Sequence, residues 1–151
     1  MSPIIITLDS GYKYLAGSLL STVFLTMFQM MNVNKYRRLA KIPYPRVYAE
    51  KAEMEGNKIA VQYNCAQRAH ANTLESLPNI FALSLITSLS MPRFAAAAVG
   101  VWTVGRVLYT IGYTTGDPNK RNTQGGFINM LALLSLVGTA SYTVFQLFTS
   151  A

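Results

Sequence analysis

The chain has 151 residues, of which 51% are hydrophobic and only 13% are charged. Soluble domains carry about 25% charged residues, so this composition argues against a soluble protein and favours one that resides in a membrane. The formal net charge is +7, but no basic strand interleaved with aromatic residues and no recognition-helix pattern accompanies it. We therefore expect no nucleic-acid partner.

Four segments approach the roughly 20 apolar residues that a helix needs to cross a bilayer. Lipid offers no hydrogen-bond partner for backbone amides, so a spanning segment must satisfy them within a helix. We therefore expect an all-α fold, an integral membrane four-helix bundle that forms one domain over residues 1–151. The predicted helices cover residues 12–33, 64–91, 94–113 and 127–148.

The loops between these helices indicate how the chain is oriented. Residues 90–93 are so few that the second and third helices must form a tight antiparallel hairpin. Seven of the 13 basic residues lie between Lys35 and Lys58, and two more, Lys120 and Arg121, lie in the loop predicted over residues 114–126. Because Lys and Arg are enriched in cytosolic loops, we expect both basic loops to face the cytosol and the two termini to lie on the far side.

The second predicted helix begins with charged and amide side chains at membrane depth. Arg68, Asn72 and Glu75 recur at helical spacing, so they share one stripe of the helix surface. Ionised groups inside a membrane are costly, and they usually face the bundle interior or a water-filled cavity. Two interpretations remain open: an internal ion pair that holds helices together, and a polar ligand site.

The third predicted helix carries a second stripe, formed by Arg106, Tyr109 and Tyr113. Tyrosines near a helix end are often interfacial anchors, but an arginine on the same face favours a pocket. Lys120 and Arg121 follow in a short loop that can fold back over such a pocket, although the orientation rule alone also accounts for basic residues there.

The two stripes together suit a small zwitterion with more than one carboxylate and an ammonium group, and glutathione has that charge pattern. Arginine binds carboxylates through a bidentate fork, and Glu75 can accept the ammonium. A cation beside a thiol lowers the pKa of that thiol and exposes the reactive thiolate. Arg121 and Arg106 are the candidates for that cation.

The sequence predicts no metal site, because it has one cysteine, Cys65, and one histidine, His70, without a cluster of further ligands. A single cysteine also excludes an intramolecular disulfide. His70 is more often a packing residue than a catalytic one in such a setting.

At these positions the chain resembles the family of membrane-associated proteins in eicosanoid and glutathione metabolism, the MAPEG family. The resemblance rests on two spaced motifs in order, Arg-Ala-His-x-Asn-x-x-Glu-x-x-Pro over residues 68–78 and Gly-Arg-Val-Leu-Tyr-x-x-Gly-Tyr over residues 105–113. It implies a homotrimer of four-helix subunits that binds glutathione near the cytosolic face. It further implies transfer of glutathione to lipophilic electrophiles, or reduction of lipid hydroperoxides, in the endoplasmic reticulum membrane or the mitochondrial outer membrane.

The resemblance also implies roles for individual residues. Arg121 would stabilise the thiolate, with Lys120 as the alternative because the loop varies in length within the family. Ser76 stands where leukotriene synthases of the family have a tyrosine, which disfavours that activity. One branch of the family binds lipids without catalysis, so an adaptor, or a subunit that only packs in a larger assembly, is the alternative to an enzyme. The residues expected to bind glutathione are Arg68, His70, Asn72, Glu75, Arg106, Tyr109, Tyr113 and Lys120, joined by Arg37 or Arg38 from a neighbouring subunit.

Overall fold

The computed structural model describes residues 9–150, and within them it is helical without any strand, so the all-α prediction is confirmed. A one-turn helix and a π-helical segment accompany the long helices. The elements are α1 (Tyr12–Ala40), α2 (Lys51–Met54), α3 (Lys58–Ser88), α4 (Pro92–Tyr113), η1 (Asn122–Gly126) and α5 (Phe127–Thr149).

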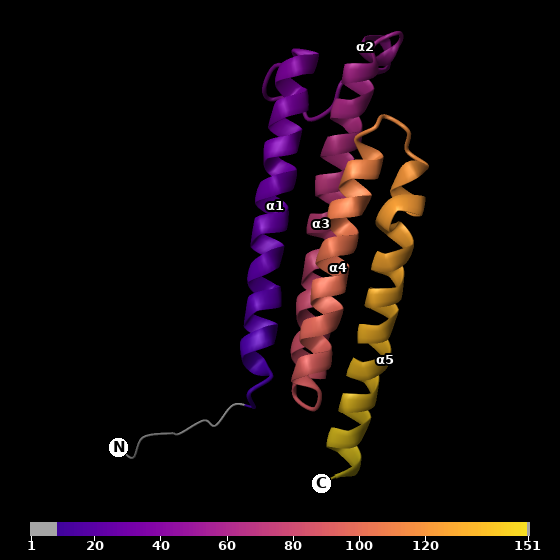
Figure 1. Ribbon diagram of the computed structural model, residues 1–151. Helices are drawn as coiled ribbons and strands as arrows, with labels where there is room; N and C mark the ends of the chain where they lie inside the picture. The colour runs from indigo at the N-terminus through magenta and orange to yellow at the C-terminus, as the bar shows by residue number, and fades with distance from the viewer. Residues whose placement is uncertain (1–8, 151) are drawn as a thin grey trace, which may run out of the picture.

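Helices α3 and α4 form a central antiparallel pair (Figure 1). The connection between them is only residues 89–91, and Pro92 begins α4 at a position where its missing N–H costs no hydrogen bond. Helix α1 packs on both members of the pair from one side, and α5 packs on both from the other. Between residues 9 and 150, α1 and α5 make no contact with each other, so each outer helix is held only by the central pair.

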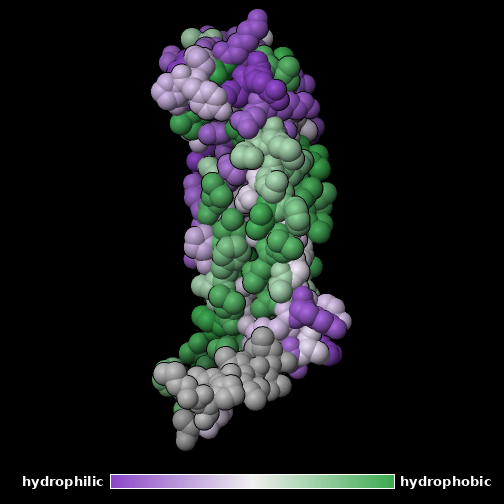
Figure 2. Space-filling view, turned by 90° about the vertical axis from the view of Figure 1, so that its left-hand side faces the viewer, coloured by the Kyte–Doolittle hydropathy of each residue, from purple (hydrophilic) through white to green (hydrophobic). Residues whose placement is uncertain are grey.

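Three helices are long and apolar enough to cross a membrane: α1, α4 and the continuous helix Asn122–Thr149. Figure 2 shows the resulting apolar belt between polar ends. The remaining predicted span lies on α3, which is 31 residues long but is not among these three. Its first half carries the polar and charged side chains that the sequence analysis singled out.

Two helices extend beyond the predicted spans. Helix α1 continues from residue 33 to Ala40 and ends at Lys41, which has a φ of 55°. Helix α3 begins at Lys58 rather than at residue 64, because the side chain of Asn57 accepts hydrogen bonds from the amides of Ile59 and Ala60. The predicted bounds were therefore too short, by seven residues at the end of α1 and by six at the start of α3, because apolar composition marks the part of a helix that suits lipid and a helix can continue into water.

The loop predicted over residues 114–126 is wrong in its second half. Asn122–Gly126 form a π-helical turn that runs directly into α5. Gly125 explains this turn, because a Cβ atom there would overlap the carbonyl oxygen of Gly105 and lie 2.5 Å from the amide nitrogen of Tyr109. The backbone of η1 therefore lies directly against α4, and π-helical turns of this kind occur frequently at functional sites.

A buried glutamine joins three helices in the middle of the bundle. Gln29 of α1 is 1% exposed, and its amide donates to the hydroxyls of Thr73 on α3, at 2.9 Å, and Thr110 on α4, at 2.8 Å. Interhelical hydrogen bonds of this kind stabilise helix packing in membranes by roughly 0.6 kcal/mol each on average. They also fix the rotation of α1 relative to the central pair.

The first loop is folded around an ion pair. Arg46 contacts Glu53 at 2.9 Å, and the amide of Glu50 donates to the same carboxylate at 2.8 Å. The hydrogen bond from Glu50, followed by the contact with Arg46, lowers the pKa of Glu53 below its ordinary value. This arrangement places the backbone of Arg46 over the end of α1.

We expect Gly125→Ala to lower the free energy of unfolding by roughly 1 to 3 kcal/mol, because the added methyl group must separate η1 from α4. Thermal denaturation of the purified protein in detergent measures the effect. The matched control is Gly138→Ala in α5, where nothing lies within 4 Å of the added atom; it keeps or raises the stability. Equal changes in the stability of Gly125→Ala and Gly138→Ala would contradict the direct contact between the backbones of η1 and α4.

Candidate functional site

A hollow of about 380 Å³ opens between α3, α4 and the start of α5. Its size falls within the range of small-molecule sites, roughly 300 to 1,000 Å³. Four of the residues predicted from the sequence line it: Asn72 and Glu75 on α3, and Arg106 and Tyr109 on α4. The rest of its wall comes from Ser76, Trp102, Asn122, Gly126, Asn129, Met130 and Leu133.

A chain of hydrogen bonds runs across the edge of this hollow. Arg68 donates to the side-chain oxygen of Asn72 at 2.9 Å, and the amide of Asn72 donates to the hydroxyl of Tyr109 at 2.8 Å. Arg68 also lies 3.9 Å from Glu75, and both side chains are about half exposed or more. The ion pair expected within α3 therefore exists, but it is loose and exposed, so Glu75 keeps most of its oxygen surface free for another cation.

Arg106 is the buried charge of the site. It is 9% exposed, and no carboxylate lies within 4.0 Å of it among residues 9–150. Its guanidinium donates to the hydroxyl of Ser76 at 2.8 Å and lies over the rings of Trp102, at 5.2 Å, and Tyr109, at 5.0 Å. The Nε atom is buried without a partner. A cation in this position has neutral hydrogen-bond and π partners but no counter-ion.

Arg121 and Tyr113 form a second pair beside the hollow. Arg121 donates to the hydroxyl of Tyr113 at 2.7 Å and lies 4.9 Å from the centre of its ring. Tyr113 packs edge-on against Tyr109, with ring centres 5.7 Å apart. Neither Arg121 nor Tyr113 lines the hollow itself. They are connected to its wall through Tyr109, whereas Lys120 is exposed and does not line the hollow.

His70 lies apart from the hollow. It follows Arg68 by two positions, a rotation of about 200° around the helix, so it faces away from the stripe of Arg68, Asn72 and Glu75. Its Nδ1 atom is buried and has no hydrogen-bond partner in the part of the chain that the structure describes. Within one subunit, His70 therefore has no route to a ligand in the hollow.

The two arginines at the end of α1 differ from each other. Arg37 is 8% exposed, donates to the carbonyl oxygen of Arg46 at 2.6 Å, and lies over the rings of Tyr44 and Tyr63. It fastens the first loop to the bundle. Arg38 is exposed, and its contact with the carbonyl oxygen of Asn34, at 3.4 Å, is long. Of the two, Arg38 is the one whose side chain is exposed to a molecule outside the bundle.

Sequence reasoning missed three polar residues of the hollow, Ser76, Asn122 and Asn129. Ser76 binds Arg106, and Asn129 lies against Gly105 with a 6% exposed side chain whose two polar atoms both lack partners within residues 9–150. The signal for Asn129 was present, since an amide in an otherwise apolar membrane helix is expensive and usually faces a cavity or another helix. Ser76 carried no comparable signal, because its importance depends on the position of Arg106.

No three His, Cys, Asp or Glu side chains gather closely enough to hold a metal ion within the described part of the chain. The chemical groups available in the hollow are therefore guanidinium, carboxylate, amide, hydroxyl and phenol.

Comparison with known protein families agrees with this arrangement of residues. The family model described as the MAPEG family matches residues 15–142. The chain belongs to the MAPEG family. The match runs from the first turn of α1 into the second half of α5, so it includes every residue of the hollow. Members of this family include glutathione transferases and peroxidases as well as other proteins, and MAPEG membership supports a membrane location together with the three apolar helices.

We expect Arg106→Met to raise the melting temperature of the ligand-free protein, because it replaces a buried cation without a counter-ion by an apolar side chain of similar length. Replacing a buried ion pair by apolar residues of similar volume often stabilises a protein, by up to roughly 4 kcal/mol, and Arg106 lacks even the partner of such a pair within the described residues. Arg106→Lys, which keeps the charge, should give no gain. Thermal denaturation in detergent measures both. A lower melting temperature for Arg106→Met would show that the contacts with Ser76 and the two rings outweigh the cost of burying the charge.

Proposed function

We propose that this MAPEG protein is a glutathione transferase and glutathione-dependent peroxidase of the type-3 microsomal kind. In this proposal α3 is the fourth membrane span and three copies form a homotrimer. The hollow faces the cytosolic side of the endoplasmic reticulum membrane, or of the mitochondrial outer membrane. The substrates are glutathione and a lipophilic electrophile or lipid hydroperoxide.

The observation that carries the proposal is the buried Arg106 in the wall of the hollow. A cation at membrane depth without a counter-ion calls for an anionic ligand. Glutathione brings two carboxylates for the arginines and an ammonium group for Glu75, whose oxygens are exposed on the same wall. A simple fatty acid would satisfy Arg106 but would leave Glu75 with only its loose contact to Arg68.

The proposed activation of the glutathione thiol depends on Arg121 and Tyr113, the pair beside the hollow. A guanidinium within reach of a thiol stabilises the thiolate and lowers the pKa of that thiol. Arg121 is held by the hydroxyl of Tyr113, so its charge is in place before glutathione binds. The thiolate then attacks the electrophilic carbon of the second substrate and forms a thioether, while a leaving group departs or a π bond opens. Alternatively it attacks the terminal oxygen of a hydroperoxide, which breaks the O–O bond, releases an alcohol after protonation and leaves a glutathione sulfenic acid. A second glutathione then converts this sulfenic acid to glutathione disulfide and water.

The apolar part of the hollow suits the second substrate. Trp102, Met130 and Leu133 supply the apolar part of its wall, and Met130 is 49% exposed. A lipophilic molecule can therefore lie beside glutathione while its remainder stays in the lipid. The hollow is open on this side, which leaves room for Arg38 of a neighbouring copy to complete the site.

We expect purified wild-type protein to show the ultraviolet difference band of a thiolate when glutathione is added, and Arg121→Ala to lose that band. The reason is that the guanidinium supplies the charge that stabilises the thiolate. Lys120→Ala should keep the band. Loss of the band in Lys120→Ala alone would assign the role to Lys120, and absence of a band in the wild type would favour a lipid-binding adaptor over an enzyme.

We expect Glu75→Gln to weaken glutathione binding about tenfold, which corresponds to one lost charge-assisted contact with the ammonium group. Isothermal titration calorimetry measures the affinity, and circular dichroism shows whether the fold is retained. Titration with a glutathione analogue that lacks the α-amino group is the control, because the wild type and Glu75→Gln should bind it equally. Unchanged affinity for glutathione itself would refute the assignment.

A further inference from the structure

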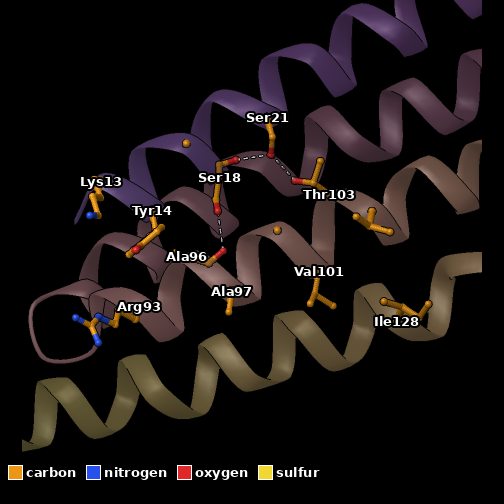
Figure 3. Close-up of a pocket in the computed structure, with 13 residues that line it drawn as sticks. Lys13, Tyr14, Ser18, Ser21, Arg93, Ala96, Ala97, Val101, Thr103 and Ile128 are labelled. Carbon is orange, nitrogen blue, oxygen red and sulfur yellow. Dashed lines mark hydrogen bonds between the residues drawn. The ribbon is translucent and has the colours of Figure 1, made fainter. Parts of the chain in front are cut away.

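A second concave site lies at the opposite end of the bundle. A groove of about 1,120 Å³ runs between α1 and α4 and reaches α5 only at Ile128 (Figure 3). It begins at Lys13, Tyr14 and Arg93, near the first turns of both helices, and ends near Val104. No residue of the groove belongs to the hollow described above.

The floor of the groove is chemically apolar even though it contains hydroxyl groups. Ser18 donates to the carbonyl oxygen of Ala96 at 2.8 Å, and Ser21 donates to the carbonyl oxygen of Ser18 at 2.6 Å. Thr103 donates within α4. Figure 3 shows the hydroxyls of Ser18 and Ser21 in hydrogen bonds with groups of α1 and α4, so they are not directed at a ligand in the groove. Since the donors are satisfied, the groove suits a hydrocarbon chain rather than a polar ligand.

Two cations stand at the mouth of this apolar groove. Lys13 lies 5.0 Å from the ring of Tyr14, and Arg93 donates to the hydroxyl of Ser10 at 3.1 Å. Neither has a carboxylate within 4.0 Å in the stretch from residue 9 to residue 150. The nearby Asp9 accepts a hydrogen bond from the amide of Gly11 at 2.6 Å. The mouth therefore presents net positive charge to its surroundings.

The length of the groove matches one leaflet of a membrane. Arg93 and Val104 are 11 positions apart on α4, which corresponds to about 16 Å along the helix axis. The hydrocarbon core of a bilayer is about 30 Å thick, so the groove extends from the interface to about the midplane. An acyl chain of a phospholipid whose headgroup lies at the interface also extends from the interface to about the midplane.

A parallel neighbouring copy of this chain offers only one acidic side chain, Asp9, as counter-charge for the mouth. Of the six acidic residues, only Asp9 lies at this end of the bundle. In any assembly of parallel copies the mouth would meet the same end of its neighbour, where Asp9 is the single carboxylate. The remaining five are Glu50, Glu53, Glu55, Glu75 and Asp117.

We propose that this groove binds an anionic membrane phospholipid from the leaflet at the N-terminal end of α1. The phosphate lies between Lys13 and Arg93, and one acyl chain lies along the groove between α1 and α4. The second acyl chain stays in the bilayer, because the groove is open along its length. Tyr14 marks the interface, as aromatic residues do at this depth.

Native mass spectrometry of the purified protein tests this site. The protein is incubated with equal amounts of phosphatidylglycerol and phosphatidylcholine that carry identical acyl chains. We expect the wild type to retain phosphatidylglycerol in preference, and the double variant Lys13→Gln with Arg93→Gln to lose that preference. An interfacial cation contributes about fivefold to the binding of an anionic headgroup, so the double variant should bind roughly 25-fold more weakly.

Lys35→Gln is the matched control, because Lys35 lies 5.5 Å from the ring of Tyr36 at the other end of α1 and therefore has the same local arrangement as Lys13. It should leave the preference unchanged. Gly17→Leu tests the groove itself: Gly17 lines the groove and nothing lies within 4 Å of a Cβ atom there, so the added side chain begins in open space and would occupy part of the groove. It should reduce retention of both phospholipids while the melting temperature stays the same.

Three results would overturn the proposal. Equal retention of the two phospholipids by the wild type would show that the cations do not select a headgroup. Displacement of phosphatidylglycerol by an equal amount of oleate would identify a free fatty acid as the occupant. A changed number of subunits in Gly17→Leu, with lipid retention intact, would show that the groove is a contact between copies of the chain.

Discussion

The structure of the site depends on one buried cation. Arg106 is held by a serine hydroxyl and two aromatic rings, and no carboxylate neutralises it within the described residues. Burial of such a charge costs stability unless a partner arrives. The neighbouring groups do not neutralise this charge, because Asn72 and Tyr109 bind each other. Within the described residues, the Nε atom of Arg106 and the amide of Asn129 are the polar groups of the wall that are buried without partners. An anionic ligand would turn a destabilising feature of the empty protein into a source of affinity.

Close backbone packing keeps that cation in position. Gly125 lies against Gly105 and Tyr109, and the π-helical turn allows this approach without interrupting the helix that continues into α5. Asn129 follows one turn later and fills the space beside Gly105. The wall of the hollow is therefore built where the backbones of η1 and α4 lie directly against each other, and side chains on rigid helices hold a ligand more accurately than side chains on loops. Gln29 of α1 donates hydrogen bonds to both α3 and α4. Helix α1 therefore restrains these two helices from the side opposite α5.

Helical periodicity and hydrophobicity were enough to predict the helices and the two polar stripes. One hollow is lined by residues of both stripes, Asn72 and Glu75 from the first and Arg106 and Tyr109 from the second. Residues at helical spacing share one face of their own helix, and this does not depend on which other helix packs against that face. The remaining features depend on contacts between distant segments. Nothing local distinguishes Arg37 from Arg38, yet the first loop buries one and leaves the other exposed. The π-helical turn results from the approach of Gly125 to α4, and glycine-rich composition alone is equally typical of a loop. The trimer stays a prediction.

The exposed edge of the hollow has a consequence for how the protein would meet its apolar substrate. Met130 and Leu133 form that edge on α5, one of the helices apolar enough to lie in lipid. A reactant dissolved in the bilayer reaches them by lateral diffusion and never crosses water. Its effective concentration is then its mole fraction in the membrane, so the same total amount of reactant becomes more dilute as the surrounding lipid area grows. The turnover of such a protein would be governed by the composition of the membrane around it as much as by the supply of its water-soluble cosubstrate.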